Sequence, residues 1–211
     1  MTKDDGVDVR AGYALRDWVY VAVFGALWGA AEMTAGAYLH VLFPPMADTF
    51  LVGLTMAGLG AIIVMVGRQF VSRGGAVLSM GIIAALLKAL SLGGMKLGPM
   101  VAIFAEALLV EIVFLPTEPA LHHHYILAGS LAVSWNFFHK FVMMRILFGK
   151  GIEEVYEKMI VDGGSVLGLD VNQAVMIIVA LFLVRVAVGA VAGQLAWVLG
   201  GAVKRRLAGD A

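Results

Sequence analysis

Between residues 173 and 203 the chain reads QAVMIIVALFLVRVAVGAVAGQLAWVLGGAV, and Arg185 is the only charged residue in this stretch. A helix needs about 20 consecutive apolar residues to cross the hydrocarbon core of a bilayer. Only helices and closed barrels satisfy every backbone hydrogen bond in lipid, and barrel strands are only about 9–11 residues long. The stretch therefore predicts a transmembrane helix.

The composition of the whole chain agrees with this prediction. Hydrophobic residues make up 61% of the 211 residues and charged residues 14%, against about 45–50% and about 25% in soluble domains. The net charge is zero, so no basic field attracts nucleic acid, and the absence of cysteine excludes disulfides and thiolate metal sites. We expect an all-α, polytopic membrane protein that contacts membrane lipid and binds no nucleic acid.

Five further stretches are long and apolar enough to be spans. They cover about residues 18–43, 49–67, 76–92, 99–115 and 125–148. The sequence thus predicts six transmembrane helices in one domain, 18–203, between an N-terminal tail, 1–17, and a C-terminal tail, 204–211.

The distribution of lysine and arginine predicts the orientation. Segments on the same side as the N-terminus hold most of these residues, including Arg16, Arg68, Arg73 and the basic run 204–206. Cytoplasmic loops are enriched in lysine and arginine. We therefore expect both termini to lie in the cytoplasm.

The connection between the fifth and sixth stretches, GIEEVYEKMIVDGG (151–164), has the pattern of an amphipathic helix. Its apolar residues recur at helical spacing from Ile152 to Ile160, and its charged residues fall on the opposite face. The predicted orientation places this helix on the external side. Two interpretations stay open, an interfacial helix resting on lipid and a lid over an outward-facing cavity.

The fifth stretch carries a polar stripe, formed by Trp135, Asn136, His139 and Lys140 on one helix face. An aromatic surface with a few directional polar groups is typical of a site for a small polar ligand. The alternative is a stripe whose polar groups hydrogen-bond to neighbouring helices.

The first stretch has two different faces. Glu32 and His40 lie on one, while Ala22, Ala26 and Ala30 form a row of small residues on a roughly opposite one. Small residues four apart let another helix approach closely. That helix belongs either to a partner or to this chain.

Three more ionisable residues lie inside predicted spans, where charged groups are costly and usually face the bundle interior. They are Lys88, Glu106 and Arg185. With Lys140, the basic residues would form a positive wall that favours an anionic group on the ligand. Alternatively, Glu106 pairs with one of them.

Other patterns argue against enzyme and metal chemistry. Consecutive histidines do not share a helix face, so the run His122, His123 and His124 favours an interfacial role over a metal site. No phosphate-binding loop, zinc-protease motif or nucleophile elbow is present. We expect no catalytic activity, no cofactor and no bound metal.

The chain resembles the substrate-binding membrane subunit, the S component, of energy-coupling-factor (ECF) transporters. The resemblance rests on about 200 residues, six spans with both ends cytoplasmic, the alanines 22, 26 and 30, and the glycine-rich ending VGAVAGQLAWVLGGAV (188–203). Members that transport metal ions begin with an extended Met-His segment, whereas this chain begins Met-Thr-Lys-Asp, which argues against nickel or cobalt.

The resemblance implies uptake of a vitamin-like molecule or cofactor precursor across a bacterial or archaeal cytoplasmic membrane. It implies that Ala22, Ala26 and Ala30 dock on a transmembrane coupling subunit, and that two ATPase subunits energise the cycle. It also implies that the stripe of the fifth span, joined by Glu106 and Arg185, faces the ligand pocket. The 151–164 helix would be part of the gate.

Two other functions remain open from the residues themselves. Intramembrane Glu32, Glu106 or His139 could relay protons in a stand-alone secondary transporter, although no inverted repeat is evident. A membrane enzyme using Glu and His as acid and base is the weaker alternative, because no catalytic grouping is visible.

Overall fold

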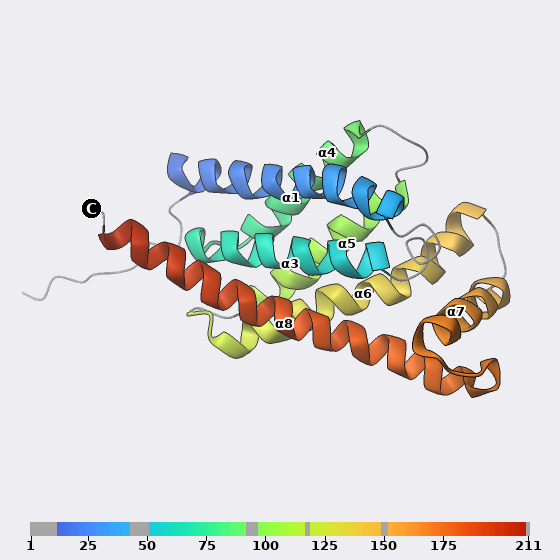
Figure 1. Ribbon diagram of the computed structural model, residues 1–211. Coiled ribbons are helices and arrows are strands. Elements are labelled where there is room, and N and C mark those ends of the chain that lie inside the picture. The colour runs from blue at the N-terminus through green and yellow to red at the C-terminus, as the bar shows by residue number, and fades with distance from the viewer. Residues whose placement is uncertain (1–11, 43–50, 92–96, 117–118, 149–151, 210–211) are drawn as a thin grey trace, which may run out of the picture.

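The computed structural model describes residues 12–42, 51–91, 97–116, 119–148 and 152–209. These residues form seven α-helices and one short 3-10 helix, with no strand among them (Figure 1). The elements are α1 (Leu15–Leu42), α3 (Val52–Phe70), α4 (Ala76–Leu90), α5 (Leu97–Phe114), α6 (His122–Phe148), α7 (Ile152–Leu167), η2 (Val171–Gln173) and α8 (Ala174–Gly209). The predicted all-α class is confirmed for this part of the chain.

Four of the helices are long and apolar enough to cross a membrane. They are α1 over Leu15–Ala35, α3, α5 and α8. The apolar helix α4 has only 15 residues. Helix α6 has 27 residues, but its histidines and its polar stripe lower its mean hydropathy. The helices are those of a membrane protein, and four of the six predicted spans meet the length and hydropathy that a span requires.

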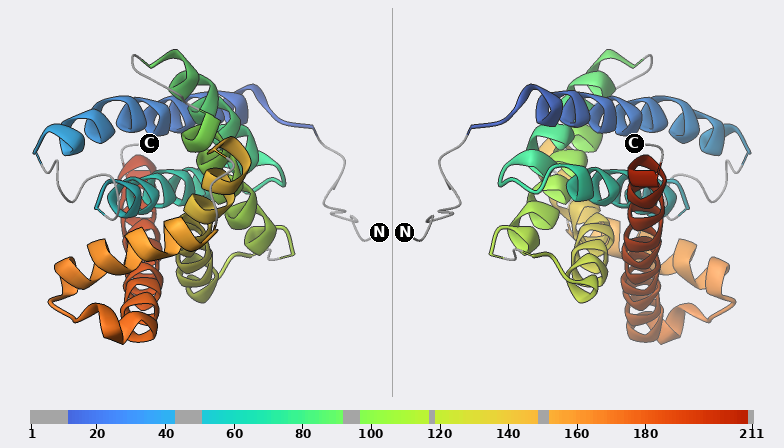
Figure 2. Two further views of the ribbon diagram at one scale, coloured as in Figure 1. Left: turned by 90° about the vertical axis from the view of Figure 1, so that its right-hand side faces the viewer. Right: turned by 90° about the vertical axis from the view of Figure 1, so that its left-hand side faces the viewer.

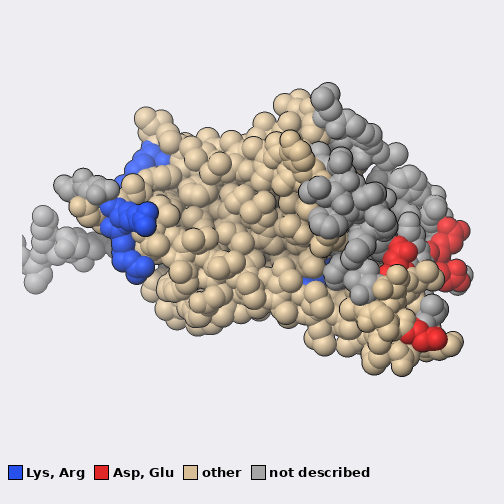
Figure 3. Space-filling model, in the orientation of Figure 1, with Lys and Arg blue, Asp and Glu red and all other residues tan. Residues whose placement is uncertain are grey.

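Charged side chains gather at two ends of the molecule, and successive helices alternate in direction between these ends (Figures 1 and 3). Lysine and arginine lie where α1 begins and α8 ends, and acidic residues lie around α7 (Figure 3). The basic end includes Arg16, Arg73, Lys204, Arg205 and Arg206, and the acidic end includes Glu154, Glu157, Asp162 and Asp170. The face between them in Figure 3 is almost free of charge, as a bilayer core requires.

Helix α3 is the central helix of the bundle. It packs against α1, α4, α5, α6 and α8, and it is the most buried of the four apolar helices. The main core surrounds it and includes the fully buried side chains of Val64, Met65, Met80 and Phe114.

The most extensive helix pair is α6 with α8, and glycines bring the two backbones into direct contact. A Cβ built on Gly129 would lie 2.2 Å from the carbonyl oxygen of Gly189, and one on Gly193 would lie 2.2 Å from that of Tyr125. Only glycine fits at these positions. The small residues that the sequence places at the end of α8 therefore pack within this chain.

Helix α7 occupies the connection that the sequence predicts to be amphipathic. Its Met159 and Ile160 are buried in a small cluster with Phe137 of α6 and Ile177 of α8, apart from the main core. Its Glu154 and Glu157 are exposed. Figure 2 shows α7 beside the first half of α8, away from the α1 side of the bundle. Its position outside a membrane stays a prediction.

Candidate functional site

Glu32 of α1, Lys88 of α4 and Glu106 of α5 form a group of charged residues, and α4 packs against both α1 and α5. Lys88 Nζ donates a 2.6 Å hydrogen bond to the backbone carbonyl of Glu32 and lies 3.4 Å from its Oε2. Glu106 of α5 is only 5% exposed, and Glu32 is the charged residue that acts on it. Among the described residues, none donates a hydrogen bond to Glu106 or forms an ion pair with it. Lys88 is thus paired with Glu32, whereas the sequence left open a pairing with Glu106.

The indole of Trp28 packs beside this group, one helical turn from Glu32. It is 1% exposed and fits against glycines of two helices, since a Cβ on Gly60 would lie 2.3 Å from Trp28 Nε1 and one on Gly81 3.5 Å from its Cζ3. The indole N–H approaches the Glu32 carboxyl. It makes no hydrogen bond of normal geometry within the described part of the chain. These glycines give no signal in the sequence, because their role depends on which helix lies opposite.

The polar stripe of α6 lies inside the bundle. The rings of Trp135 and His139 have centroids 6.2 Å apart. Trp135 Nε1 and His139 Nδ1 are buried, and neither finds a hydrogen-bond partner among the described residues. The Asn136 amide packs on the backbone of α3, where a Cβ on Gly53 would lie 2.6 Å from Asn136 Oδ1.

Both groups lie in the half of the bundle nearer the acidic end. Lys88 is in the last turn of α4 and Gly53 is in the first turn of α3, and both of these helix ends lie away from the basic end of the bundle (Figure 1). A buried polar group without a partner costs about 1–3 kcal/mol and is rare in native structures. Several such groups in one half of a bundle are typical of a site that water or a ligand completes.

Arg185 lies between its own helix, α8, and Phe137 of α6. Its Nη1 donates a 3.0 Å hydrogen bond to the carbonyl of Leu181, and its guanidinium lies 5.4 Å from the ring centroid of Phe137. Arg185 thus lies beside the α6–α7–α8 cluster, and among the described residues the charged group that acts on Glu106 is Glu32. Lys88 is paired with Glu32 and the Lys140 side chain lies outside the described residues, so the positive wall of Lys88, Lys140 and Arg185 stays a prediction.

Two predicted site residues have side chains outside the described residues. They are His40 and Lys140, whose backbones belong to α1 and α6.

The row Ala22, Ala26 and Ala30 lies on the outer surface of α1 and is exposed. The opposite face of the same helix carries the buried Trp28 and Glu32. No described helix of this chain covers the alanines, in contrast to the glycines of α8.

The basic end holds a carboxylate whose role the sequence did not reveal. Glu111 is 3% exposed. Its Oε1 accepts a 2.7 Å hydrogen bond from the Gly75 N–H, and its Oε2 accepts a 3.1 Å bond from the Leu78 N–H. Glu111 therefore caps the N-terminus of α4, where free N–H groups and the helix dipole favour a negative charge. The turn Arg73–Gly74–Gly75 that precedes α4 is the only hint of this in the sequence.

The same turn is also fastened to the start of α1. Asp17 Oδ2 accepts hydrogen bonds from the Ala14 N–H at 3.0 Å and from Arg73 Nε at 3.2 Å. The Tyr13 hydroxyl donates a 2.8 Å hydrogen bond to the Gly74 carbonyl. Partial burial, and after it the negative charge of Glu111, raise the pKa of Tyr13.

The histidine run has structural contacts at the start of α6. The His122 ring hydrogen-bonds to the Gln194 side chain on α8, and His124 Nδ1 accepts a 3.0 Å bond from the Leu121 N–H. Within the described ranges, no group of three or more histidine, aspartate or glutamate residues has the geometry of a metal site.

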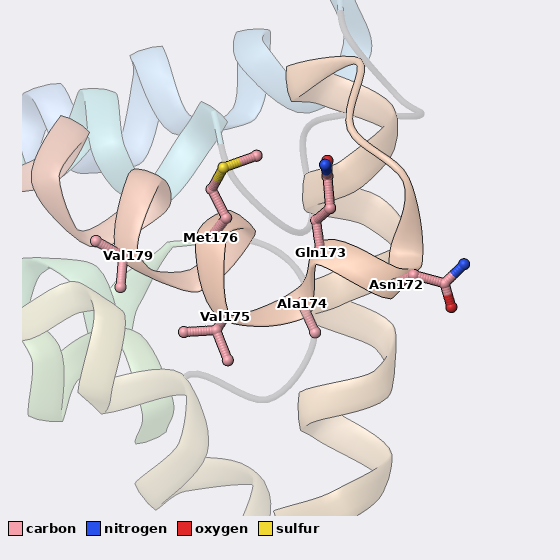
Figure 4. A pocket seen from close by; sticks show the side chains of 6 residues that line it. All are labelled: Asn172, Gln173, Ala174, Val175, Met176 and Val179. Carbon is pink, nitrogen blue, oxygen red and sulfur yellow. The ribbon is translucent and has the colours of Figure 1, made fainter.

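A surface hollow of about 510 Å³ lies at the start of α8, apart from these groups (Figure 4). Its lining side chains are Asn172, Gln173, Ala174, Val175, Met176 and Val179. The hollow is lined mainly by apolar atoms and contains none of the predicted site residues.

Comparison of the chain with protein-family models, curated proteins and solved structures finds no match.

Proposed function

We propose that this chain is the substrate-capturing S component of an ECF-type transporter, with six spans and both termini in the cytoplasm. It would take up a small vitamin-like molecule or cofactor precursor, energised by a coupling subunit and two ATPases. The observation that carries the proposal is the two-sided character of α1. One face of this helix contributes Trp28 and Glu32 to a buried polar site, and the other presents a row of exposed alanines.

The charge distribution supports the proposed orientation. Lysine and arginine gather at one end of the bundle, and cytoplasmic segments are rich in these residues. The candidate site then opens toward the external half of the membrane, where a capture subunit meets its substrate. Helices α4 and α6 would be the remaining two spans, with α6 hydrated along its polar stripe.

The test is co-purification of the tagged chain with the coupling subunit and ATPases from native membranes. Ala26→Leu places a bulky side chain in the middle of the exposed row and should abolish co-purification. Ala187→Leu is the matched control, because Ala187 is an exposed alanine on α8. The docking assignment is wrong if Ala26→Leu retains the partners, or if both variants lose them equally.

A stand-alone proton-coupled transporter is the second candidate, and the buried Glu106 favours it. A carboxyl group that meets no donor among the described residues could carry a proton across the site. Purified chain in liposomes would then accumulate substrate in response to an imposed pH gradient, without any other subunit. An S component alone would bind substrate without accumulating it.

A further inference from the structure

The charges of the candidate site are not balanced by the described side chains. The group formed by α1, α4 and α5 contains two carboxyl groups, Glu32 and Glu106, and one ammonium, Lys88. Lys88 Nζ is paired with Glu32, through a 2.6 Å hydrogen bond to the backbone carbonyl and a 3.4 Å ion pair with Oε2. Glu106 is therefore a buried carboxyl group with no cationic partner among the described side chains, and an unpaired buried charge is costly.

None of the described residues forms a hydrogen bond with the carboxyl oxygens of Glu106. The neighbouring Trp28 indole is 1% exposed, and its N–H is directed toward Glu32. Gly81 of α4 packs against Ala107, the residue after Glu106 on α5. Neither Gly81 nor Ala107 has a polar side chain that could hydrogen-bond to the Glu106 carboxyl. An ionised carboxylate is an acceptor only, so a ligand complementary to Glu106 must bring a donor.

We propose, on the basis of the proposed function, that the captured compound carries a basic nitrogen, which binds Glu106 as a protonated amine. The ammonium supplies a positive charge that none of the described side chains provides to Glu106. The Trp135 N–H, which is also buried in this half of the bundle and has no partner among the described residues, is a donor only and would meet an acceptor elsewhere on the same compound. This inference differs from the anionic ligand that the sequence favoured, because Lys88 is neutralised and Arg185 lies beside Phe137.

The test uses three probes of one shape: benzylamine, benzyl alcohol and benzoate. Binding to the purified full chain in nanodiscs is measured by titration calorimetry at neutral pH, with empty nanodiscs correcting for partition into lipid. We expect saturable binding of benzylamine in the millimolar range, with the alcohol and the carboxylate about tenfold weaker or more, as for loss of a charged hydrogen bond.

Glu106→Gln keeps the shape of the side chain and should remove the preference for the amine. Glu157→Gln is the matched control, because it removes the same charge from an exposed position on α7. The proposal is overturned if benzoate binds more tightly than benzylamine, if no saturable amine binding occurs, or if Glu106→Gln keeps the preference. If the titrations fail but the chain still co-purifies with the coupling subunit and ATPases, only the amine proposal is wrong and the proposed function stands. If benzylamine binds as expected but no ECF subunit co-purifies, the chain binds amines but the proposed function is wrong.

Discussion

Glu106 and Glu111 are buried carboxylates on the same helix, and their surroundings are opposite. Glu111 accepts hydrogen bonds from the N–H groups of Gly75 and Leu78 at the start of α4. Glu106, only five residues away, meets no donor among the described residues, and its charged neighbour is another carboxylate, Glu32. Two residues of one type on one helix thus do different work. Glu111 fixes a helix end, whereas Glu106 has no donor among the described residues.

The contrast extends to the two halves of the bundle. At the basic end, Asp17 accepts from Arg73, and Tyr13 donates to Gly74, so the turn before α4 is held by side chains of α1 and α5. Toward the acidic end, the indole nitrogens of Trp28 and Trp135 and one imidazole nitrogen of His139, Nδ1, have no hydrogen-bond partner in the described ranges. Satisfied polar networks make a region rigid, whereas unsatisfied ones mark positions that a ligand or water completes.

The largest predicted effect comes from one substitution made at both glutamates. Glu111→Gln leaves a buried N–H at the start of α4 facing an amide NH2, so we expect the free energy of unfolding to fall by about 2–4 kcal/mol. Glu106→Gln removes a buried acid that no donor among the described residues stabilises, so stability should be unchanged or higher. Thermal and denaturant unfolding in one detergent measure both. Equal destabilisation by the two variants would show that Glu106 and Glu111 do not differ in their contribution to stability.

A smaller effect is expected where Trp28 packs against α3. Gly60→Ala puts a methyl group where the indole nitrogen lies, at 2.3 Å from Nε1. We expect overpacking to lower the free energy of unfolding by about 1–3 kcal/mol and to shift the Trp28 fluorescence emission. Ligand binding should weaken as well, because the indole would be pushed toward Glu32.

Gly58→Ala is the control for this prediction, on the same helix. Its added Cβ would lie 3.5 Å from Val188 Cγ1, which is ordinary van der Waals contact. Alanine also has the higher helix propensity, so stability should be unchanged or slightly higher. If the two alanine variants behave alike, Trp28 is not confined by Gly60.

The helices could be predicted from the sequence, but the partners of the polar residues could not. Length and apolar content predict α8, and the periodicity between Ile152 and Ile160 predicts α7. Helical spacing also separates the alanine row of α1 from Glu32, and the structure places them on exposed and buried faces. Spacing within a helix does not reveal which helix lies opposite. The pairing of Lys88 with Glu32, the cap formed by Glu111 and the position of Arg185 all depend on that arrangement.

The smallest predicted effect concerns Tyr13, at the edge of the well-satisfied basic end. Tyr13→Phe removes the hydrogen bond to Gly74, and we expect a loss of about 0.5–1.5 kcal/mol in the free energy of unfolding at neutral pH. The side chain is partly exposed, so the effect belongs at the lower end of that range.

The pH dependence gives this variant a second signature. Partial burial and the nearby Glu111 raise the pKa of Tyr13, so the folded protein holds its phenolic proton more tightly than the unfolded chain. The contribution is complete below the ordinary tyrosine pKa of about 10 and is lost as pH rises through the raised value. The stability difference between wild type and Tyr13→Phe should therefore shrink above about pH 10. A difference that grows with alkaline pH would mean that the folded state favours the phenolate, and that Glu111 does not act on Tyr13.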